Sequence, residues 1–168
     1  TVPPETLFSE YVYLSGVSET VVRHSEAHAA DLLDERDLCA DDLVVEIASN
    51  DGTLLAPFHR AGVDVLGIEP AGNIAERARA RGIPTRICFF GRQAGADLAA
   101  EGVSADVVLA NNVLAHVPDP VGFVAGIRSI LAPGGVAEIE VPWVVDLIDN
   151  VEFDTIYHEH LCYFSLHA

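Results

Sequence analysis

Four consecutive residues near the end of this 168-residue chain could move protons: Tyr157, His158, Glu159 and His160. An imidazole titrates nearest to neutral pH, and a neighbouring carboxylate or phenol can orient it and raise its basicity. The same side chains also form ordinary hydrogen-bond networks in loops, and these four residues alone do not separate the two interpretations. The choice between proton chemistry and a structural hydrogen-bond network therefore depends on the elements that position the cluster.

Composition and charge limit the partners of the chain. The formal net charge is −17, and all nine basic side chains are arginines. Such a surface does not track a phosphate backbone, so nucleic acid is excluded as a partner, although a small anion could still be held locally. The apolar stretches are too short to span a membrane and the N-terminus lacks the pattern of a signal peptide, so we expect a cytoplasmic protein.

Metal ligation has little support in the sequence. The three cysteines form no C-x-x-C pair. A site built from His158 and His160 with His116 or Glu159 matches no standard zinc spacing, and we expect no metal. His24 and His28 lie four residues apart on an expected helix, but without an acidic partner at matching spacing we interpret them as surface residues.

Short apolar runs alternate with helix-forming stretches through most of the chain. Pro3-Pro4 suggests an extended start, and a capping serine predicts a helix over 18–36. Strands are expected over 43–48, 63–68, 83–89, 105–110 and 136–141, with helices over 54–61, 71–81, 93–100 and 119–131 between them. This βαβ alternation predicts an α/β fold with a Rossmann-like, mostly parallel sheet.

An open parallel sheet binds its ligand beyond the carboxyl ends of its strands. Polar or conformationally special residues follow four of the expected strands: 46–52, Glu69-Pro70, Asn111-Asn112 and Pro142-Trp143. We therefore expect these residues to meet at one edge of the sheet.

The loop from Glu46 to Gly52 turns from strand to helix with small residues, so its backbone amides can approach a ligand. It has one of the three glycines of a dinucleotide fingerprint. It is closer to the E-x-G-x-G-x-G loop of class I S-adenosylmethionine-dependent methyltransferases, with Ala48 and Asn50 where glycines are usual. Glu46 or Asp51 would then help to position the methionine end of the cofactor. A tight turn capped by Asn or Asp is the alternative.

Glu69 ends the second expected strand, where a carboxylate can accept both hydroxyls of a ribose. This device serves NAD and S-adenosylmethionine alike, and a solvated Glu before Pro70 is the alternative. Asn111 and Asn112, followed by His116, suit polar contacts to a ligand, although Asn pairs also close turns.

Four runs of the sequence resemble one family. The runs VEIASNDGTLL (45–55), GIEPA (67–71), NNVLAHVPD (111–119) and FDTIYHEH (153–160) are similar to the nucleotide-sugar C-methyltransferases of deoxysugar biosynthesis. The last run is not shared by methyltransferases at large. The resemblance implies a class I fold and methyl transfer from S-adenosylmethionine to C3 of a nucleotide-linked 4-keto deoxysugar, of the kind found in antibiotics.

The resemblance also implies roles for the cluster. A 4-keto group acidifies the C3 proton, a base removes that proton, and the resulting carbanion attacks the methyl group. In the family the second histidine of the run is the base, which is His160 here. Glu159 and Tyr157 would orient the base or contact the sugar and enolate, His116 would lie in the same pocket, and Tyr11 would cover it.

The cofactor set follows from the strand ends and the resemblance together. We expect S-adenosylmethionine to contact Glu46, Ala48, Asn50, Asp51, Gly52, Glu69, Pro70, Asn111 and Asn112.

The chain departs from the family in its flanks. We expect an N-terminal segment, residues 1–17, and a cofactor-binding domain, residues 18–168, without the family's zinc domain, its C-terminal sugar-nucleotide domain or the last two strands of its sheet. The fifth strand would then be an unpaired edge that favours self-association. An O- or N-methyltransferase, a cofactor-binding module without catalysis and an NAD-dependent oxidoreductase remain alternatives.

Overall fold

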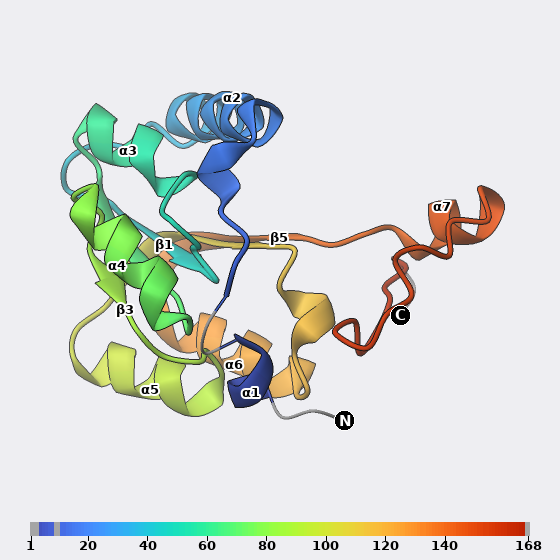
Figure 1. Cartoon of the computed structure of the whole chain (residues 1–168). Coiled ribbons are helices and arrows are strands. Elements are labelled where there is room, and N and C mark those ends of the chain that lie inside the picture. The colour runs from blue at the N-terminus through green and yellow to red at the C-terminus, as the bar shows by residue number, and fades with distance from the viewer. Residues whose placement is uncertain (1–3, 9–10, 167–168) are drawn as a thin grey trace.

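Five parallel strands form the centre of the molecule, in the order β3-β2-β1-β4-β5 (Figure 1). The computed structural model describes residues 4–8 and 11–166. The strands are β1 (Leu43–Ile47), β2 (Asp64–Ile68), β3 (Thr85–Arg86), β4 (Ala105–Asn111) and β5 (Leu131–Glu140). The predicted α/β class with a Rossmann-like parallel sheet is confirmed. Because the strand order reverses between β1 and β4, their carboxyl ends form the expected ligand-binding crevice.

Most of the helices connect the strands or flank the sheet. The helices are α1 (Pro4–Phe8), α2 (Glu19–Glu35), α3 (Leu55–Ala61), α4 (Gly72–Ala80), α5 (Arg92–Ala100), α6 (Pro120–Ile130) and α7 (Val144–Asp149), with short 3-10 turns η1 (Ser15–Val17) and η2 (Leu114–His116). Two predicted caps are confirmed. The Ser18 hydroxyl accepts the Val21 N–H, and the Asp119 carboxylate accepts the Gly122 N–H at 2.9 Å.

Alternate residues of the central strands face two different hydrophobic layers. On β4, Val107 and Leu109 pack with residues of α2 and α3, whereas Val108 and Ala110 pack with residues of α5 and α6. Figure 1 shows α2 and α3 on one side of the sheet and α5 and α6 on the other. Because both faces are covered, β4 reads as a continuous apolar run.

Several elements differ from the sequence prediction. The extended start is wrong at Pro4, which begins α1, because the fixed φ of proline suits a first helical turn. The third strand is reduced to Thr85–Arg86, the only residues of the predicted strand 83–89 that pair with β2. The fifth strand starts at Leu131, directly after α6, so Pro133 and the two following glycines lie within it. Helix α7 was not predicted.

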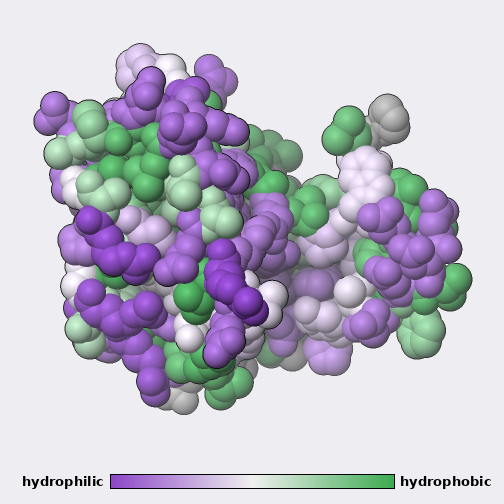
Figure 2. All heavy atoms as spheres, turned by 90° about the horizontal axis from the view of Figure 1, so that it is seen from above, coloured by the Kyte–Doolittle hydropathy of each residue, from purple (hydrophilic) through white to green (hydrophobic). Residues whose placement is uncertain are grey.

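After β5 the chain leaves the body as a projecting arm, residues 142–166 (Figure 1). The arm is held together by a bridge between Trp143 and Phe164. It returns to the sheet edge where the Leu161 N–H donates to the Ala115 carbonyl at 2.7 Å. Figure 2 shows polar and apolar groups interspersed on the arm. None of the helices described in this chain is long and apolar enough to cross a membrane.

Helices α5 and α6 touch through glycine backbones. A Cβ added at Gly126 would lie 2.5 Å from the Gly91 carbonyl oxygen and 2.9 Å from its carbonyl carbon. At Gly72, the first residue of α4, an added Cβ would meet nothing within 4 Å. An alanine at Gly126 would therefore change both helix packing and helix propensity, whereas an alanine at Gly72 would change helix propensity alone.

We expect Gly126→Ala to lower the free energy of unfolding by about 1–3 kcal/mol, because the clash outweighs the better helix propensity of alanine. Gly72→Ala serves as the control and should leave stability unchanged or slightly raised. Urea unfolding of both variants checks this. A Gly126→Ala protein as stable as the parent would mean that the two helices are not in backbone contact.

Candidate active site

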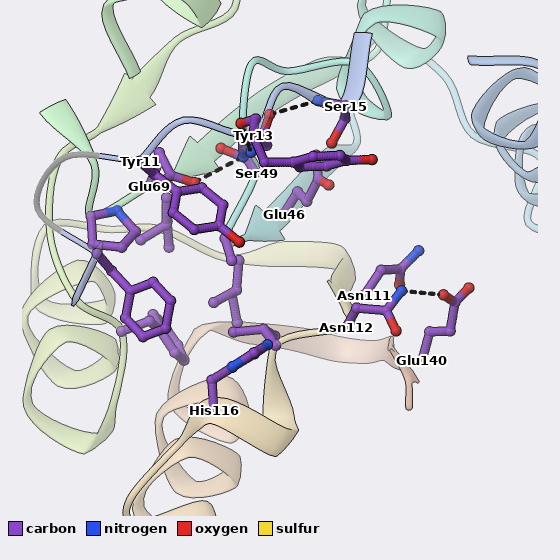
Figure 3. Close-up of a pocket in the computed structure, with 18 of the residues that line it drawn as sticks. Tyr11, Tyr13, Ser15, Glu46, Ser49, Glu69, Asn111, Asn112, His116 and Glu140 are labelled. Atoms are coloured by element: carbon purple, nitrogen blue, oxygen red, sulfur yellow. Dashed lines mark hydrogen bonds between the residues drawn. The ribbon is translucent and has the colours of Figure 1, made fainter. Parts of the chain in front are cut away.

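A cavity of about 890 Å³ opens at the carboxyl ends of β1, β2 and β4. Its size suits a cofactor-sized ligand. Twelve of the predicted site residues line it: Tyr11, Glu46, Ala48, Asn50, Glu69, Pro70, Asn111, Asn112, His116, Tyr157, Glu159 and His160. Figure 3 shows that Glu46 and Glu69 come from one side of the cavity and Asn111, Asn112 and His116 from the other. Segments far apart in the sequence therefore meet here.

Two residues of the predicted cofactor set, Asp51 and Gly52, do not line the cavity. The buried Asp51 carboxylate accepts the Thr53 hydroxyl at 2.6 Å and pairs with Arg81 at 3.1 Å. Gly52 has φ +76°, and a Cβ there would lie 2.9 Å from Ile83. In the structure both residues shape the loop that borders the cavity.

Glu69 joins the two loops that border the cavity. Its buried carboxylate accepts the Asn50 N–H at 2.9 Å and the Ala71 N–H at 2.8 Å, one on each oxygen. Burial raises the pKa of Glu69, while these two backbone donors lower it. Each oxygen keeps a further lone pair that can accept a hydroxyl group.

Three buried polar atoms in the cavity wall have no hydrogen-bond partner in the part of the chain that the structure describes: Glu46 Oε2, Ser49 Oγ and Asn111 Oδ1. Buried polar atoms are almost always hydrogen-bonded in native proteins, so these three indicate a ligand. Burial raises the pKa of Glu46 well above its ordinary value, and the nearby Glu69 and Asp51 raise it further. An ammonium group placed beside Glu46 would compensate for that burial.

The charge of the wall also favours a cation. Four carboxylates, from Glu46, Glu69, Glu140 and Glu159, line the cavity, and no arginine does so among the described residues. S-adenosylmethionine carries a sulfonium and an ammonium, and its ribose hydroxyls and its ammonium are donors that match the acceptors present. The residues in the wall therefore fit this cofactor.

Two imidazoles from separate loops of the chain lie side by side. The rings of His116 and His160 have centroids 4.8 Å apart. His116 Nδ1 lies 3.0 Å from the Glu159 carbonyl oxygen, and His160 Nδ1 lies 2.9 Å from the Thr155 carbonyl oxygen. A carbonyl only accepts, so Nδ1 of each ring carries the proton and a neutral ring has Nε2 as its acceptor.

The acceptor nitrogen of His160 is hydrogen-bonded to a phenol. The Tyr157 hydroxyl lies 3.0 Å from His160 Nε2, and the neutral phenol donates to it. Burial raises the pKa of Tyr157, with a further rise from Glu159. Burial is also the main cause of the lowered pKa of His116. His158, by contrast, is exposed and does not line the cavity.

An N-terminal strap, residues 11–16, lies at the cavity and supplies residues that the sequence did not predict. Tyr13 and Ser15 line the cavity beside Tyr11 (Figure 3). Phe8 lies between Tyr11 and His116, with ring centroids 5.9 and 5.6 Å away. Burial raises the pKa of Tyr11, so its hydroxyl is a donor at neutral pH. Only the aromatic content of this stretch could have indicated these contacts.

His24 is exposed, as predicted for a surface residue, whereas His28 is largely buried, and both histidines have acidic partners that were not predicted. His28 Nε2 lies 2.9 Å from Glu138 Oε1, and His24 Nε2 lies 3.6 Å from Glu140 Oε2. The His28 side chain is only 15% exposed. The partners come from β5, more than 100 residues away, so sequence spacing could not show them. Among the described residues no group of His, Cys, Asp or Glu has the geometry of a metal site.

Fold and cavity together define an α/β domain of the class that holds a ligand at the carboxyl ends of a parallel sheet. Residues 23–168 match the family model described as "Methyltransferase domain". The chain therefore belongs to this family.

Two methyltransferases have sequences similar to this chain. C-methyltransferase NovU from Streptomyces niveus is 39% identical over 166 residues, which cover 98% of this chain and 39% of that protein. A ubiquinone biosynthesis O-methyltransferase from Roseobacter denitrificans is 34% identical over 93 residues, covering 55% of this chain and 38% of that protein. The chain thus spans well under half the length of these relatives.

Solved structures share the fold. A SAM-dependent methyltransferase from Archaeoglobus fulgidus aligns with a TM-score of 0.64 and 14% identity, over 85% of this chain and 64% of that one. DesVI from Streptomyces venezuelae aligns with a TM-score of 0.55 and 22% identity, over 71% and 51% of the two chains. At these identities the likeness supports the fold alone.

We expect Glu46→Gln to stabilise the protein at neutral pH and to weaken cofactor binding. Below about pH 4.3, the ordinary pKa of Glu, the carboxyl is protonated in both the folded and the unfolded chain. Above this pH Glu46 ionises in the unfolded chain before it ionises in the folded chain, because folding raises its pKa. The free energy of unfolding of the parent therefore falls as the pH rises. The Glu46→Gln variant has no carboxyl group at this position, so its stability does not fall for this reason.

Thermal melts of parent and variant at pH 4 and pH 8 measure the effect, and calorimetry with S-adenosylmethionine measures the binding. The difference in Tm should be small at pH 4 and should favour the variant at pH 8. Equal differences at both pH values would mean that folding does not raise the pKa of Glu46.

Proposed function

We propose that this protein transfers a methyl group from S-adenosylmethionine to the carbon beside the keto group of a nucleotide-linked 4-keto deoxysugar, at C3. One observation carries the proposal: the adjacent rings of His116 and His160, with Tyr157 on the Nε2 of His160, share a cavity with Glu69. The similarity to NovU, a C-methyltransferase, supports methylation at carbon.

Cofactor binding is assigned to the strand ends. Glu69 accepts the ribose hydroxyls with the lone pairs that its two backbone donors leave free. Glu46 Oε2 and Asn111 Oδ1, both unpartnered, accept from the ammonium of the methionine part. Ala48, Asn50, Pro70 and Asn112 complete the wall, and Asp51 and Gly52 support it from outside the cavity. The bound cofactor supplies a methyl group activated by the positive charge on sulfur.

Deprotonation is assigned to His160. When the sugar ketone lies beside Tyr157, the phenol can turn from His160 Nε2 to the ketone oxygen. Nε2 then takes the C3 proton, the C–H bonding pair forms the enolate, and the Tyr157 O–H stabilises the charge on its oxygen. The nucleophilic carbon next takes the methyl group, and the bonding pair of the broken S–C bond stays on sulfur. Hydrogen bonding to the Thr155 carbonyl keeps His160 in the required tautomer.

His116 and Glu159 assist this step. Burial lowers the pKa of His116, so its ring is neutral when the adjacent His160 becomes a cation. Two imidazolium rings at this separation would repel each other. Glu159 orients His116 through its backbone carbonyl, and its side chain reaches the same cavity. Tyr11 places a second phenol donor at the cavity wall.

The anionic part of the substrate lies beyond this wall. No arginine lines the cavity among the described residues, and its four carboxylates would repel a diphosphate. We therefore place only the sugar ring in the cavity and the nucleotide outside it. The described strands leave one side of β5 unpaired, and we assign self-association to this edge.

We expect His160→Ala to lose roughly 10²- to 10⁴-fold in the exchange of the C3 hydrogen of a nucleotide-linked 4-keto sugar with deuterated solvent, because the general base is removed. His158→Ala is the matched control, since His158 is exposed and does not line the cavity. Nuclear magnetic resonance of the sugar in D₂O, with S-adenosylhomocysteine present, measures the exchange.

Exchange by His160→Ala at the parental rate would contradict the assignment of the base. A parent that methylates without any exchange would favour transfer to oxygen, which requires no carbon acid and agrees with the O-methyltransferase relatives.

A further inference from the structure

Asn73 stands in the first turn of α4, outside the cavity wall. Both halves of its amide bind the backbone of a single residue. Asn73 Oδ1 accepts the Tyr11 N–H at 3.2 Å, and Asn73 Nδ2 donates to the Tyr11 carbonyl at 2.7 Å. A β-strand partner would use the same two groups, so this amide fixes both the position and the direction of the backbone at Tyr11.

The rest of the N-terminal strap is held in a similar way. Asn50 Oδ1 accepts the Ser15 N–H at 2.9 Å, and Asn50 Nδ2 donates to the Tyr13 carbonyl at 3.1 Å. The Asn50 backbone N–H and the Ala71 N–H, two residues before Asn73, both donate to Glu69. The strap is therefore attached to the two loops that Glu69 organises.

Tyr11 begins a row of aromatic rings that ends at the base. Successive ring centroids are separated by 5.9 Å from Tyr11 to Phe8, 5.6 Å from Phe8 to His116, and 4.8 Å from His116 to His160. A displacement of the Tyr11 backbone would move the first ring of this row. Asn73 makes the only side-chain hydrogen bonds to that backbone among the described residues.

We propose that Asn73 is a positioning residue that aligns Tyr11 over the reaction centre and so couples ribose binding at Glu69 to the arrangement of the catalytic rings. This inference rests on the proposed function for its effect on methyl transfer. The contact itself, a two-point clamp on the strap, does not depend on the reaction.

Asn73→Ala should raise the exchange rate of the Tyr11 backbone amide by roughly tenfold and lower kcat by a similar factor, since two partly exposed hydrogen bonds are lost. The KM for S-adenosylmethionine should change by less than about twofold, because Asn73 does not line the cavity. Gln93→Ala is the matched control: Gln93 holds the same place in the first turn of α5, but among the described residues its amide bonds only to Asp97 of that helix.

Two further variants separate positioning from folding. In a Tyr11→Phe background Asn73→Ala should add less than about twofold to the loss of kcat, because it acts through Tyr11. Asn73→Asp keeps the acceptor for the Tyr11 N–H and loses the donor. A carboxylate in a first helical turn favours the helix, so Tm should hold or rise while kcat still falls.

Different results would overturn the clamp, the positioning role and the proposed function. Unchanged exchange of the Tyr11 amide in Asn73→Ala would overturn the clamp, whatever reaction the protein catalyses. Faster exchange with parental kcat would overturn the positioning role, as would a kcat that simply follows Tm across the variants. A parent that binds cofactor but methylates no keto sugar would instead contradict the proposed function.

Discussion

The carboxylate of Glu69 is the interaction on which the site depends. It is buried at the end of β2, and each of its oxygens accepts a backbone N–H from a different loop. Through these bonds the loop after β1 and the start of α4 are held at a fixed separation. Burying a charged group is costly unless it is hydrogen-bonded, so the two donors make Glu69 tolerable where a ribose would need it.

The rings to which we assign catalysis come from outside the sheet, so their alignment depends on contacts made by loops. His116 follows β4 through the turn η2, whereas Tyr157 and His160 belong to the projecting arm, which is tied to η2 by the Leu161 backbone. The strap brings Tyr11 from the opposite end of the chain. Loops on a rigid sheet can bring such groups together, but each then needs its own anchor. Backbone carbonyls anchor the two imidazoles, and asparagine amides anchor the strap.

Residue patterns predicted the sheet and much of its ligand edge, because strand ends are local features. Glu46, Glu69 and Asn111 could be placed from the strand in which each occurs. The acid and base roles came from the similarity of the Tyr-His-Glu-His run to a known family. Asn73 and the partners of His28 were missed, because an amide in a helix and a carboxylate on β5 show no local sign of contacts formed 62 and 110 residues away.

Binding of the cofactor at Glu69, with its reactive end towards the histidine pair, is the central claim. A crystal structure with S-adenosylhomocysteine tests it most directly. The ribose hydroxyls should donate to Glu69, and the thioether sulfur should face the side of the cavity that holds His116 and His160. A nucleoside bound away from Glu69, or a sulfur facing away from the two rings, would contradict the account.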